Sequence, residues 1–371
     1  MSFHDDCLVF DGHTDVPSRL WESPADLAAP LPDRHVDLPR LRRGGVDALV
    51  FALYVPASLS VAAGREHART LFRLSRERLG RGLVQATSAE EVRRAASRGE
   101  VAVVFGLENG RPLGAVRQPG GLGDPGFLGE CAAMGVRYVT LTHNASHEWC
   151  DASTDAPIHG GLAPAGIPLI REMNRRGILP DVSHVSDAAV AQVLAVSTVP
   201  PVASHSSARA LCDVPRNLPD GLVREIARRG GVVMANSYAA FVGPEAARAN
   251  AKRLEEIGPA LAELDEPYLR DPAKYGEEIR RLFADRPLPP VPLAAFVDHL
   301  IHLVELGGEE HVGIGTDFDG ITEPLDGFED PSRFPDLTAA LLERGVDKPG
   351  VRLILGENFL RLLSQAEKAA G

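Results

Sequence analysis

The sequence predicts a (β/α)8 barrel of the TIM type, with eight parallel strands alternating with helices. Short apolar runs rich in Val, Ile and Leu recur along the 371 residues, and helix-like patterns separate them. Runs that are apolar throughout suit strands buried on both faces, although periodicity alone leaves a buried helix open for any single run. The eight runs are Cys7–Phe10, Asp47–Val55, Val101–Leu107, Val136–Leu141, Ile178–Val182, Val199–Ala203, Gly231–Ala235 and His311–Gly315.

Helix signals lie between these runs. Ser88 opens a capping box, because glutamates follow it ahead of an apolar stripe. A second helix over 167–176 is closed by Gly177, a residue suited to the left-handed position after a helix. Similar patterns cover 219–229, 292–306 and the tail after Lys348.

The chain is predicted to form one domain over residues 1–371, since α/β barrels often run this long as single units. The main irregularity is a long, charged stretch at about 243–290 that contains a helical segment, Glu245–Glu256. We interpret it as a helical excursion after the seventh strand and not as a second domain.

Composition narrows the function classes. A net charge of −12 argues against nucleic acid or an anionic membrane as the main partner. Four scattered cysteines favour reduced thiols over a disulfide framework. The acidic N-terminus lacks the pattern of a secretory signal. A run of about 18 apolar residues, the length needed to span a bilayer, does not occur in the sequence. We therefore expect a cytoplasmic protein that does not associate with membranes.

Ionisable residues follow six of the eight runs directly. In a barrel, the carboxyl ends of all strands meet at one rim, which is where barrel enzymes place their chemistry. Buried strand ends seldom carry such groups by chance, because an unpaired buried charge is costly. The residues are His13, Asp15, Glu108, His143, His184, His205 and Asp317.

These residue types suit a pair of metal ions. His13 and Asp15 are two apart, so on a strand they share a face and can bind one ion. Glu108 has two oxygens and could bridge two ions, while His184 and His205 supply two more imidazoles. We expect two Zn²⁺ per chain, with other divalent ions as alternatives, about 3.5–4 Å apart.

Three further residues suit the reaction itself. Asp317 can accept and relay a proton from a metal-held water, which would be the nucleophile. His143 is available to stabilise the developing oxyanion, and Arg216 is available to bind a substrate carboxylate. Each residue alone also has an ordinary interpretation as a cap, a turn or a hydrogen-bonding group, and only the combination favours a site.

The remaining histidines are weaker candidates. We expect His4 to be solvated, and His311 to open the eighth strand at the opposite end of the barrel. His147 and His159 are close enough to the mouth to support the site indirectly. The others are expected to be structural or at the surface: His35, His67, His299 and His302. The sequence has no phosphate-binding loop and no nucleophile elbow.

Through these residues and the motifs around them, the sequence resembles the membrane dipeptidase family, also called renal dipeptidase, within the amidohydrolase-like barrels. The matching stretches occur in the same order as in the family and extend from about residue 7 to residue 365. The matching stretches are Asp11–Pro17, Gly106–Glu108, Leu141–Asn144, Asp181–Ser186, Ser204–Ser207, Pro215–Asp220, Asp298–Leu300, Gly315–Gly320, Phe334–Leu337 and Gly356–Leu360.

The resemblance implies a role for each position. His13 and Asp15 would bind the first zinc, Glu108 would bridge, and His184 with His205 would complete the second. Asp317 would hold the reactive water and later protonate the leaving amine. His143 would contact the substrate and the tetrahedral intermediate, and Arg216 would hold the C-terminal carboxylate of a dipeptide.

Some features depart from the family pattern. Thr14 stands where the family usually has Asn, at a position that is not a ligand. The stretch 236–241 lacks an aromatic hydroxyl that members often carry, which leaves substrate preference open. The mammalian members are secreted, disulfide-linked and lipid-anchored, and nothing here supports those features, so the resemblance is to a bacterial, cytoplasmic member.

The sequence is compatible with three functions. The first is a zinc-dependent dipeptidase, a metallopeptidase whose partner is a dipeptide substrate. The second is a binuclear metal amidohydrolase acting on N-acyl amino acids or lactams. The third is a non-catalytic binding protein on the same scaffold, which the full set of ligands disfavours. A homodimer is the default expectation for the oligomeric state.

Overall fold

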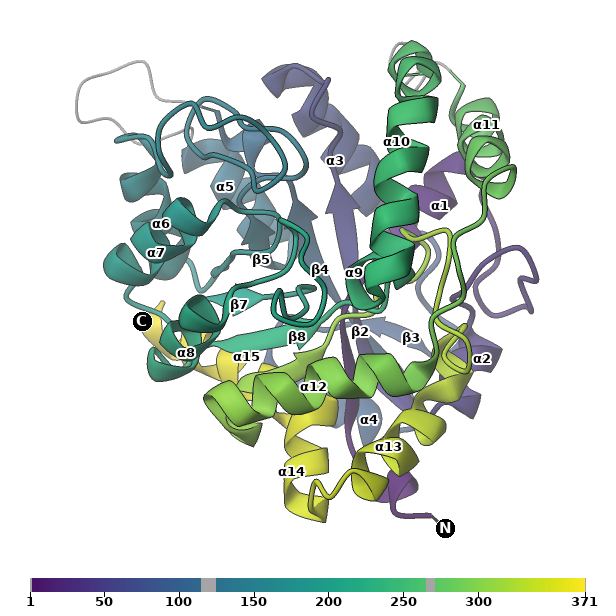
Figure 1. Cartoon of the computed structure of the whole chain (residues 1–371). Helices are drawn as coiled ribbons and strands as arrows, with labels where there is room; N and C mark the ends of the chain where they lie inside the picture. The colour runs from purple at the N-terminus through teal and green to yellow at the C-terminus, as the bar shows by residue number, and fades with distance from the viewer. Residues whose placement is uncertain (1, 115–124, 265–270, 371) are drawn as a thin grey trace.

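Eight parallel strands follow one another around the sheet in sequence order, as the apolar runs predict. The computed structural model describes residues 2–114, 125–264 and 271–370. Every neighbouring pair on the path is parallel, so all carboxyl ends lie at one rim (Figure 1). The strands on this path are β1 (Val9–Thr14), β2 (Val46–Tyr54), β4 (Val101–Glu108), β5 (Val136–Thr140), β6 (Leu179–Asp181), β7 (Val202–Ala203), β8 (Val232–Ala235) and β9 (Val312–Ile314).

Backbone contacts between the first and last strands close the barrel just beyond their ends. The amide of Asp317 donates to the carbonyl of His13 at 3.0 Å, and the amide of Asp15 donates to the carbonyl of Phe318 at 2.9 Å. Thr14 and Phe318 form a parallel bridge between these two bonds. The barrel seam is thus closed at the rim that carries the candidate ligands.

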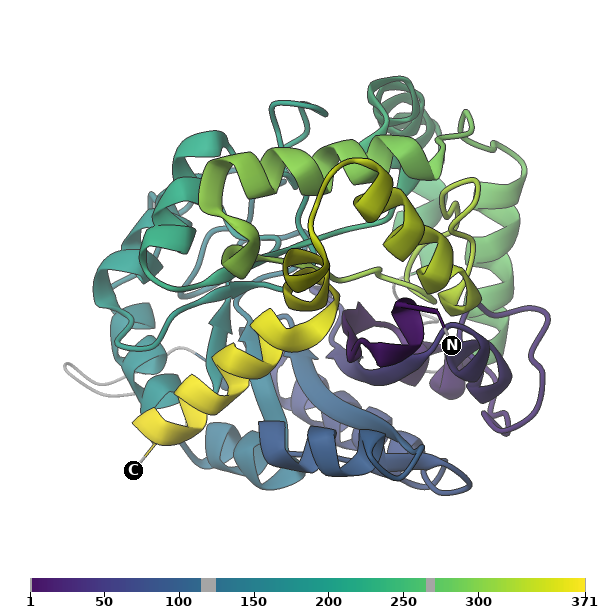
Figure 2. The ribbon, with the colours of Figure 1, turned by 90° about the horizontal axis from the view of Figure 1, so that it is seen from below.

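Helices surround the barrel, and most connect one strand to the next (Figures 1 and 2). They are α1 (Val16–Glu22), α2 (Leu38–Arg43), α3 (Val61–Arg76), α4 (Ala89–Ala96), α5 (Pro125–Met134), α6 (Gly166–Arg175), α7 (Asp187–Val196), α8 (Asp220–Arg228), α9 (Ala239–Val242), α10 (Pro244–Leu264), α11 (Pro272–Ala284), α12 (Leu293–Gly307), α13 (Phe334–Glu343), α14 (Lys348–Arg352) and α15 (Asn358–Ala369).

Local signals account for the helix ends. The Ser88 hydroxyl accepts the amide of Glu91 and caps α4. The Glu91 carboxylate accepts the amide and hydroxyl of Thr87, one residue earlier than a standard capping box predicts. Gly177 follows α6 with a φ of +66°, a left-handed conformation that glycine adopts without strain.

The C-terminal helix closes the end of the barrel opposite the candidate site. Figure 2 shows α15 lying across this lower face. Phe359 packs edge-on against Phe10 of β1 with ring centroids 4.8 Å apart, and Leu363 is fully buried in the same cluster. Because this end is filled with apolar side chains, only the opposite rim is left for chemistry.

Helices α10 and α11 form the excursion predicted after the seventh run, and residues 265–270 of that stretch lie outside the described part. The buried Arg253 of α10 contacts the carboxylate of Glu323 and donates to the hydroxyl of Tyr238 at 2.7 Å. Glu323 belongs to the loop after β9, so this arginine attaches α10 to the rim.

Two sequence expectations are corrected. The short strand β3 (Leu83–Gln85) pairs with β4 and was missed, because a three-residue run carries almost no periodic signal. His4 is buried and not solvated. Its ring nitrogens lie 2.7 Å from the Thr338 hydroxyl and 2.8 Å from the Gly44 carbonyl, contacts between segments too distant in sequence to foresee. Within the described ranges, none of the helices combines the length and apolarity needed to cross a membrane.

Candidate metal centre

The candidate ligands gather at the barrel mouth because each follows or ends its strand. The ligand atoms of three sets lie within 4.8 Å of one another: His13, Glu108 and His205; Glu108, His143 and His184; and His13, Asp15 and Asp317. All seven residues predicted for this rim are therefore brought together. Thr14, which lies between His13 and Asp15 in the sequence, points away from the ligands, and its hydroxyl donates to the carbonyl of Val50 at 2.7 Å.

Glu108 lies between two groups of ligands. Its Oε2 is 3.5 Å from Nε2 of His13, and its Oε1 is 3.3 Å from Nε2 of His184 and 3.6 Å from Nε2 of His205. Asp15 Oδ2 lies 3.7 Å from the same nitrogen of His13. One carboxylate thus presents a separate oxygen to each group, which is the arrangement a bridging ligand needs.

The ring orientation of His13 is fixed by Tyr138. The Tyr138 hydroxyl is 2.7 Å from Nδ1 of His13 and 3.2 Å from the carbonyl of Gly12, to which it donates. Its oxygen is then the acceptor for a proton on Nδ1, so Nε2 carries the lone pair. That Nε2 is fully buried and has no hydrogen-bond partner among the described residues. A buried, unpaired imidazole nitrogen beside carboxylates fits a metal ligand.

His205 has a longer support chain. Its Nδ1 lies 2.7 Å from the Ser204 hydroxyl, and that hydroxyl lies 2.6 Å from Oδ2 of Asp181, which is fully buried. If Ser204 donates to the carboxylate, it accepts from Nδ1 of His205 and again leaves Nε2 free. A histidine held through its other nitrogen in this way is typical of metal sites.

His184 completes the set. Its Nδ1 is 3.2 Å from the amide oxygen of Asn144, and its Nε2 is 2.9 Å from Nε2 of His205. Burial, reinforced by the Arg216 charge, holds the pKa of His184 well below its usual value, and burial does the same for His205. If each ring carries its proton on the Nδ1 that its supporting residue binds, the two Nε2 atoms present adjacent lone pairs, and a shared cation would relieve their repulsion. The residues present fit a metal pair.

Asp317 faces the same space from the last strand. Its Oδ1 is 4.0 Å from Nε2 of His13, while its Oδ2 accepts the side-chain amide of Asn236 at 2.9 Å. Burial raises the pKa of the Asp317 carboxyl, as it does for Asp15. Because Asn236 holds Oδ2, Oδ1 is the oxygen that faces the ligands, and a carboxylate placed there can exchange a proton with a group bound between them.

Strained backbone marks this rim. His184 and Asp317 have φ values of +65° and +66°, and Asn109 and Asp319 beside the ligands have +76° and +69°. Left-handed conformations cost a non-glycine residue roughly 1–2 kcal/mol. These residues are concentrated at strand ends. This indicates that the direction of their side chains, and not the lowest backbone conformational energy, determines the local geometry.

His143 and Arg216 border the ligand cluster. His143 Nε2 is 4.0 Å from Glu108 Oε1, and burial together with the Arg216 charge lowers the pKa of His143 to about 3. Arg216 donates to the His205 carbonyl at 3.1 Å, and its guanidinium lies 5.3 Å from the Phe241 ring centre. Burial lowers the pKa of Arg216 to about 10, so it remains charged at neutral pH.

Several supporting residues were not assigned roles from the sequence. Asn144, Asp181 and Ser204 adjoin ligands in the quoted motifs, so their position was a usable signal. Asn236 directly follows the seventh apolar run, so its position at the rim was also a usable signal, but it is not ionisable. Tyr138 had no such signal, since it lies inside an apolar strand. The His147 ring bonds to the carbonyl of Leu141, and the His159 ring bonds to the carbonyl of His147. Both histidines therefore support the loop after β5 and not the ligands.

A closed barrel whose rim gathers histidines and carboxylates around a central glutamate defines a metal-dependent hydrolase. Comparison with known proteins narrows this class. Residues 2–371 match the membrane dipeptidase family, peptidase family M19, and the chain belongs to this family. It is a dipeptidase, a metallopeptidase that hydrolyses peptide bonds.

Individual relatives agree with this assignment. Dipeptidase verJ of Clonostachys rogersoniana is 30% identical over 388 residues, covering 98% of this chain and 86% of that protein. The probable dipeptidase PvdM from Pseudomonas aeruginosa superposes with a TM-score of 0.81 at 27% identity, over 99% and 97% of the two chains. A metallopeptidase from Rhodobacter sphaeroides, solved with a phosphinate mimic of L-Ala-D-Ala, has a TM-score of 0.77 at 26% identity, over 97% and 99%.

Proposed function

We propose that this dipeptidase works with two zinc ions held on either side of Glu108. His13, Asp15 and one oxygen of Glu108 would hold the first ion, and His184, His205 and the other oxygen would hold the second. The observation that carries the proposal is the placement of the two Glu108 oxygens, one facing His13 and the other facing both remaining histidines. When bound, such ions supply Lewis-acid activation of water and of the scissile carbonyl.

Asp317 is proposed to move the proton. Asn236 occupies one of its oxygens, so the other is left to accept a proton from the attacking water and to pass it to the leaving amine.

His143 and Arg216 are proposed to hold the substrate. The neutral His143 imidazole can donate a hydrogen bond to the oxygen on which charge develops. The buried guanidinium of Arg216 would pair with the free C-terminal carboxylate, which favours substrates that have a single residue after the scissile bond. Because the Rhodobacter sphaeroides relative was solved with a mimic of L-Ala-D-Ala, we include dipeptides with a C-terminal D-residue among the substrates. A cytoplasmic location and a homodimer stay predictions from the sequence.

A dipeptide panel tests the proposal. Zinc-loaded protein is incubated with L–L, L–D and glycine-containing dipeptides and with N-acetyl amino acids, and released amino acids are measured. We expect cleavage of dipeptides, about two zinc ions per chain by elemental analysis, and a kcat for Asp317→Asn lower by about two orders of magnitude or more. Cleavage of N-acetyl amino acids alone would replace dipeptides as the substrate class, and full turnover by Asp317→Asn would remove the proton role.

A further inference from the structure

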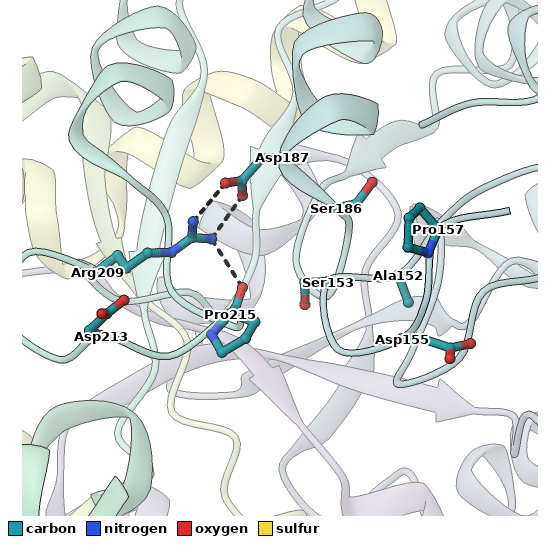
Figure 3. Close-up of a pocket in the computed structure, with 9 residues that line it drawn as sticks. All are labelled: Ala152, Ser153, Asp155, Pro157, Ser186, Asp187, Arg209, Asp213 and Pro215. Carbon is teal, nitrogen blue, oxygen red and sulfur yellow. Dashed lines mark hydrogen bonds and ion pairs between the residues drawn. The ribbon is translucent and has the colours of Figure 1, made fainter. Parts of the chain in front are cut away.

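Arg209, in the loop after β7, connects three segments at the rim. Its Nε donates to the Asn217 carbonyl at 2.8 Å and its Nη2 to the Pro215 carbonyl at 3.2 Å. Its Nη1 and Nη2 also donate to the two oxygens of Asp187 at 2.6 and 2.8 Å (Figure 3). This parallel pair of bonds fixes the guanidinium plane as well as its position.

The two carbonyls that Arg209 binds belong to the residues on either side of Arg216. One guanidinium therefore restrains the peptide group that joins Pro215 to Arg216 and the one that follows Asn217, which limits the directions in which the Arg216 side chain can leave the backbone. Nε of Arg216 is buried and has no hydrogen-bond partner within the described part of the chain. The other nitrogens of Arg216 bind one segment, donating to the His205 carbonyl at 3.1 Å and to the Ser206 hydroxyl at 3.5 Å, so the backbone around Arg216 supplies the remaining restraint.

The other end of the connection reaches a candidate metal ligand. Asp187 is the first residue of α7 and lies three residues after His184. The carbonyl of His184 accepts the amide of Ser153 at 2.8 Å and the hydroxyl of Thr142 at 3.0 Å, which anchors that segment to the loop after β5. The ion pair between Arg209 and Asp187 thereby sets the spacing between the segment of Arg216 and the segment of His184.

A cavity of about 320 Å³ lies beside this ion pair. Asp187, Arg209 and Pro215 line one side of it, and Ala152 and Ser153 lie opposite (Figure 3). The Asp187 side chain is 46% exposed and that of Arg209 is 24% exposed. Ion pairs this open to water contribute little to stability, so a geometric role explains the four bonds better than a stabilising one.

We propose that Arg209, held by Asp187, is a positioning residue that sets Arg216 for the substrate carboxylate. The proposal rests on the function proposed above for Arg216. A dipeptide has one free carboxylate, and a buried arginine binds it well only if the guanidinium already points at it. Arg209 then acts on substrate binding and leaves the bond-breaking groups untouched.

The test compares Arg209→Ala, Arg209→Lys and Asp187→Asn with Arg228→Ala as the matched control. Arg228 forms a similar two-bond pair with Glu225, but on the outer surface of α8. Steady-state kinetics are measured with a dipeptide and with the same dipeptide carrying a C-terminal amide. For the dipeptide we expect KM to rise about tenfold in Arg209→Ala and Asp187→Asn, with kcat within about twofold. Both constants should be unchanged for the amide and in the control.

Each other outcome has a clear meaning. An unchanged KM in Arg209→Ala and Asp187→Asn overturns the proposal, and so does an equal loss with the dipeptide and the amide, because that loss reports general damage. Arg216→Ala separates the two levels of inference. If Arg216→Ala leaves the dipeptide KM unchanged, the carboxylate role of Arg216 fails. If it raises KM while Arg209→Ala does not, only the positioning role fails. Should Arg209→Ala fold poorly, Arg209→Lys and Asp187→Asn decide, since both retain much of the side chain.

Discussion

The hydroxyl of Tyr138 lies 2.7 Å from Nδ1 of His13, and the two rings are nearly parallel, with an interplanar angle of 18°. The tyrosine comes from β5 and the histidine from β1, so the contact crosses the interior of the barrel. Gly106 makes room for the tyrosine ring, because a Cβ at position 106 would lie 2.5 Å from it. The ring of His13, whose Nε2 is proposed to bind a metal, is therefore oriented by a residue on another strand.

Replacing Tyr138 by Phe should weaken metal binding while the fold is kept. Without the hydroxyl, Nδ1 of His13 loses its partner and the ring loses its preferred tautomer. Loss of such a partner typically lowers metal affinity about 10- to 100-fold. Competition with a chromophoric zinc chelator measures this change. Tyr275→Phe on α11 is the control, and equal affinities of the two variants would refute the orienting role of Tyr138.

Replacing Glu108 by Gln should remove the link between the two ligand groups. An amide is neutral and has one oxygen, so only one of the two groups keeps an oxygen ligand at this position, and the NH2 group repels a cation. We expect bound zinc to fall from about two to about one per chain and kcat/KM to fall on the order of 10³-fold. Elemental analysis and kinetics check this, with the exposed Glu305→Gln as control. Two ions per chain in Glu108→Gln would show that the carboxylate does not bridge.

Removing metal should destabilise the protein as well as inactivate it. Without cations, the buried carboxyls of Asp15 and Asp317 lack compensation, which is why burial raises the pKa of each. Ions that bind only the folded state add stability in proportion to the logarithm of their concentration over Kd. We expect chelation to lower Tm by roughly 5 °C or more. A Tm that does not respond to chelator and to added zinc would contradict a preformed metal site.

His299 should make stability depend on pH independently of the metal. Its Nδ1 accepts the amide of Ala208 at 3.0 Å, and its Nε2 lies 3.1 Å from the Val242 carbonyl, so the folded state requires the neutral ring. Burial lowers the pKa of His299 to about 4, whereas an unfolded histidine titrates near 6.5. The unfolded chain therefore binds more protons in this range, and the free energy of unfolding falls as pH decreases from about 6.5 to about 4.

Chemical denaturation of metal-free protein at several pH values measures this effect. The decrease from His299 alone is at most about 1.4 kcal/mol per pH unit. His299→Gln, which cannot titrate, should be less stable than the parent at pH 7, and the gap should narrow toward pH 4. A gap that stays constant or widens on acidification would rule out the proposed cause.

The eight strands and the seven rim residues could be predicted because each depends on a local pattern. A buried parallel strand must be apolar, and an ionisable residue directly after it must lie at the carboxyl rim. Glu108 and His205 were found in this way. Tyr138 was not, because its position inside an apolar strand looks like ordinary core until the barrel closes and brings it to His13. Asn236 was missed for a different reason: it directly follows the seventh run, but its side chain is not ionisable, and its bond to Asp317 depends on the folded barrel.

The burial of His4 shows the same limit at the other end of the barrel. Its partners, Gly44 and Thr338, are 40 and 334 residues away, and nothing in the local sequence indicates either contact. The connection from Arg209 to Asp187 also joins segments far apart in sequence, a loop and the start of α7. Contacts between loops depend on the three-dimensional path of each loop, which propensity and periodicity do not encode.

The barrel seam links integrity of the fold to occupancy of its mouth. The two amides that fasten β1 to the segment after β9 belong to Asp15 and Asp317, whose side chains face the space between the ligands. Any fluctuation that parts the first and last strands must also pull those carboxylates apart. A bound cation would oppose that separation, so the hydrogens on these two amides should exchange with solvent deuterium more slowly when zinc is present.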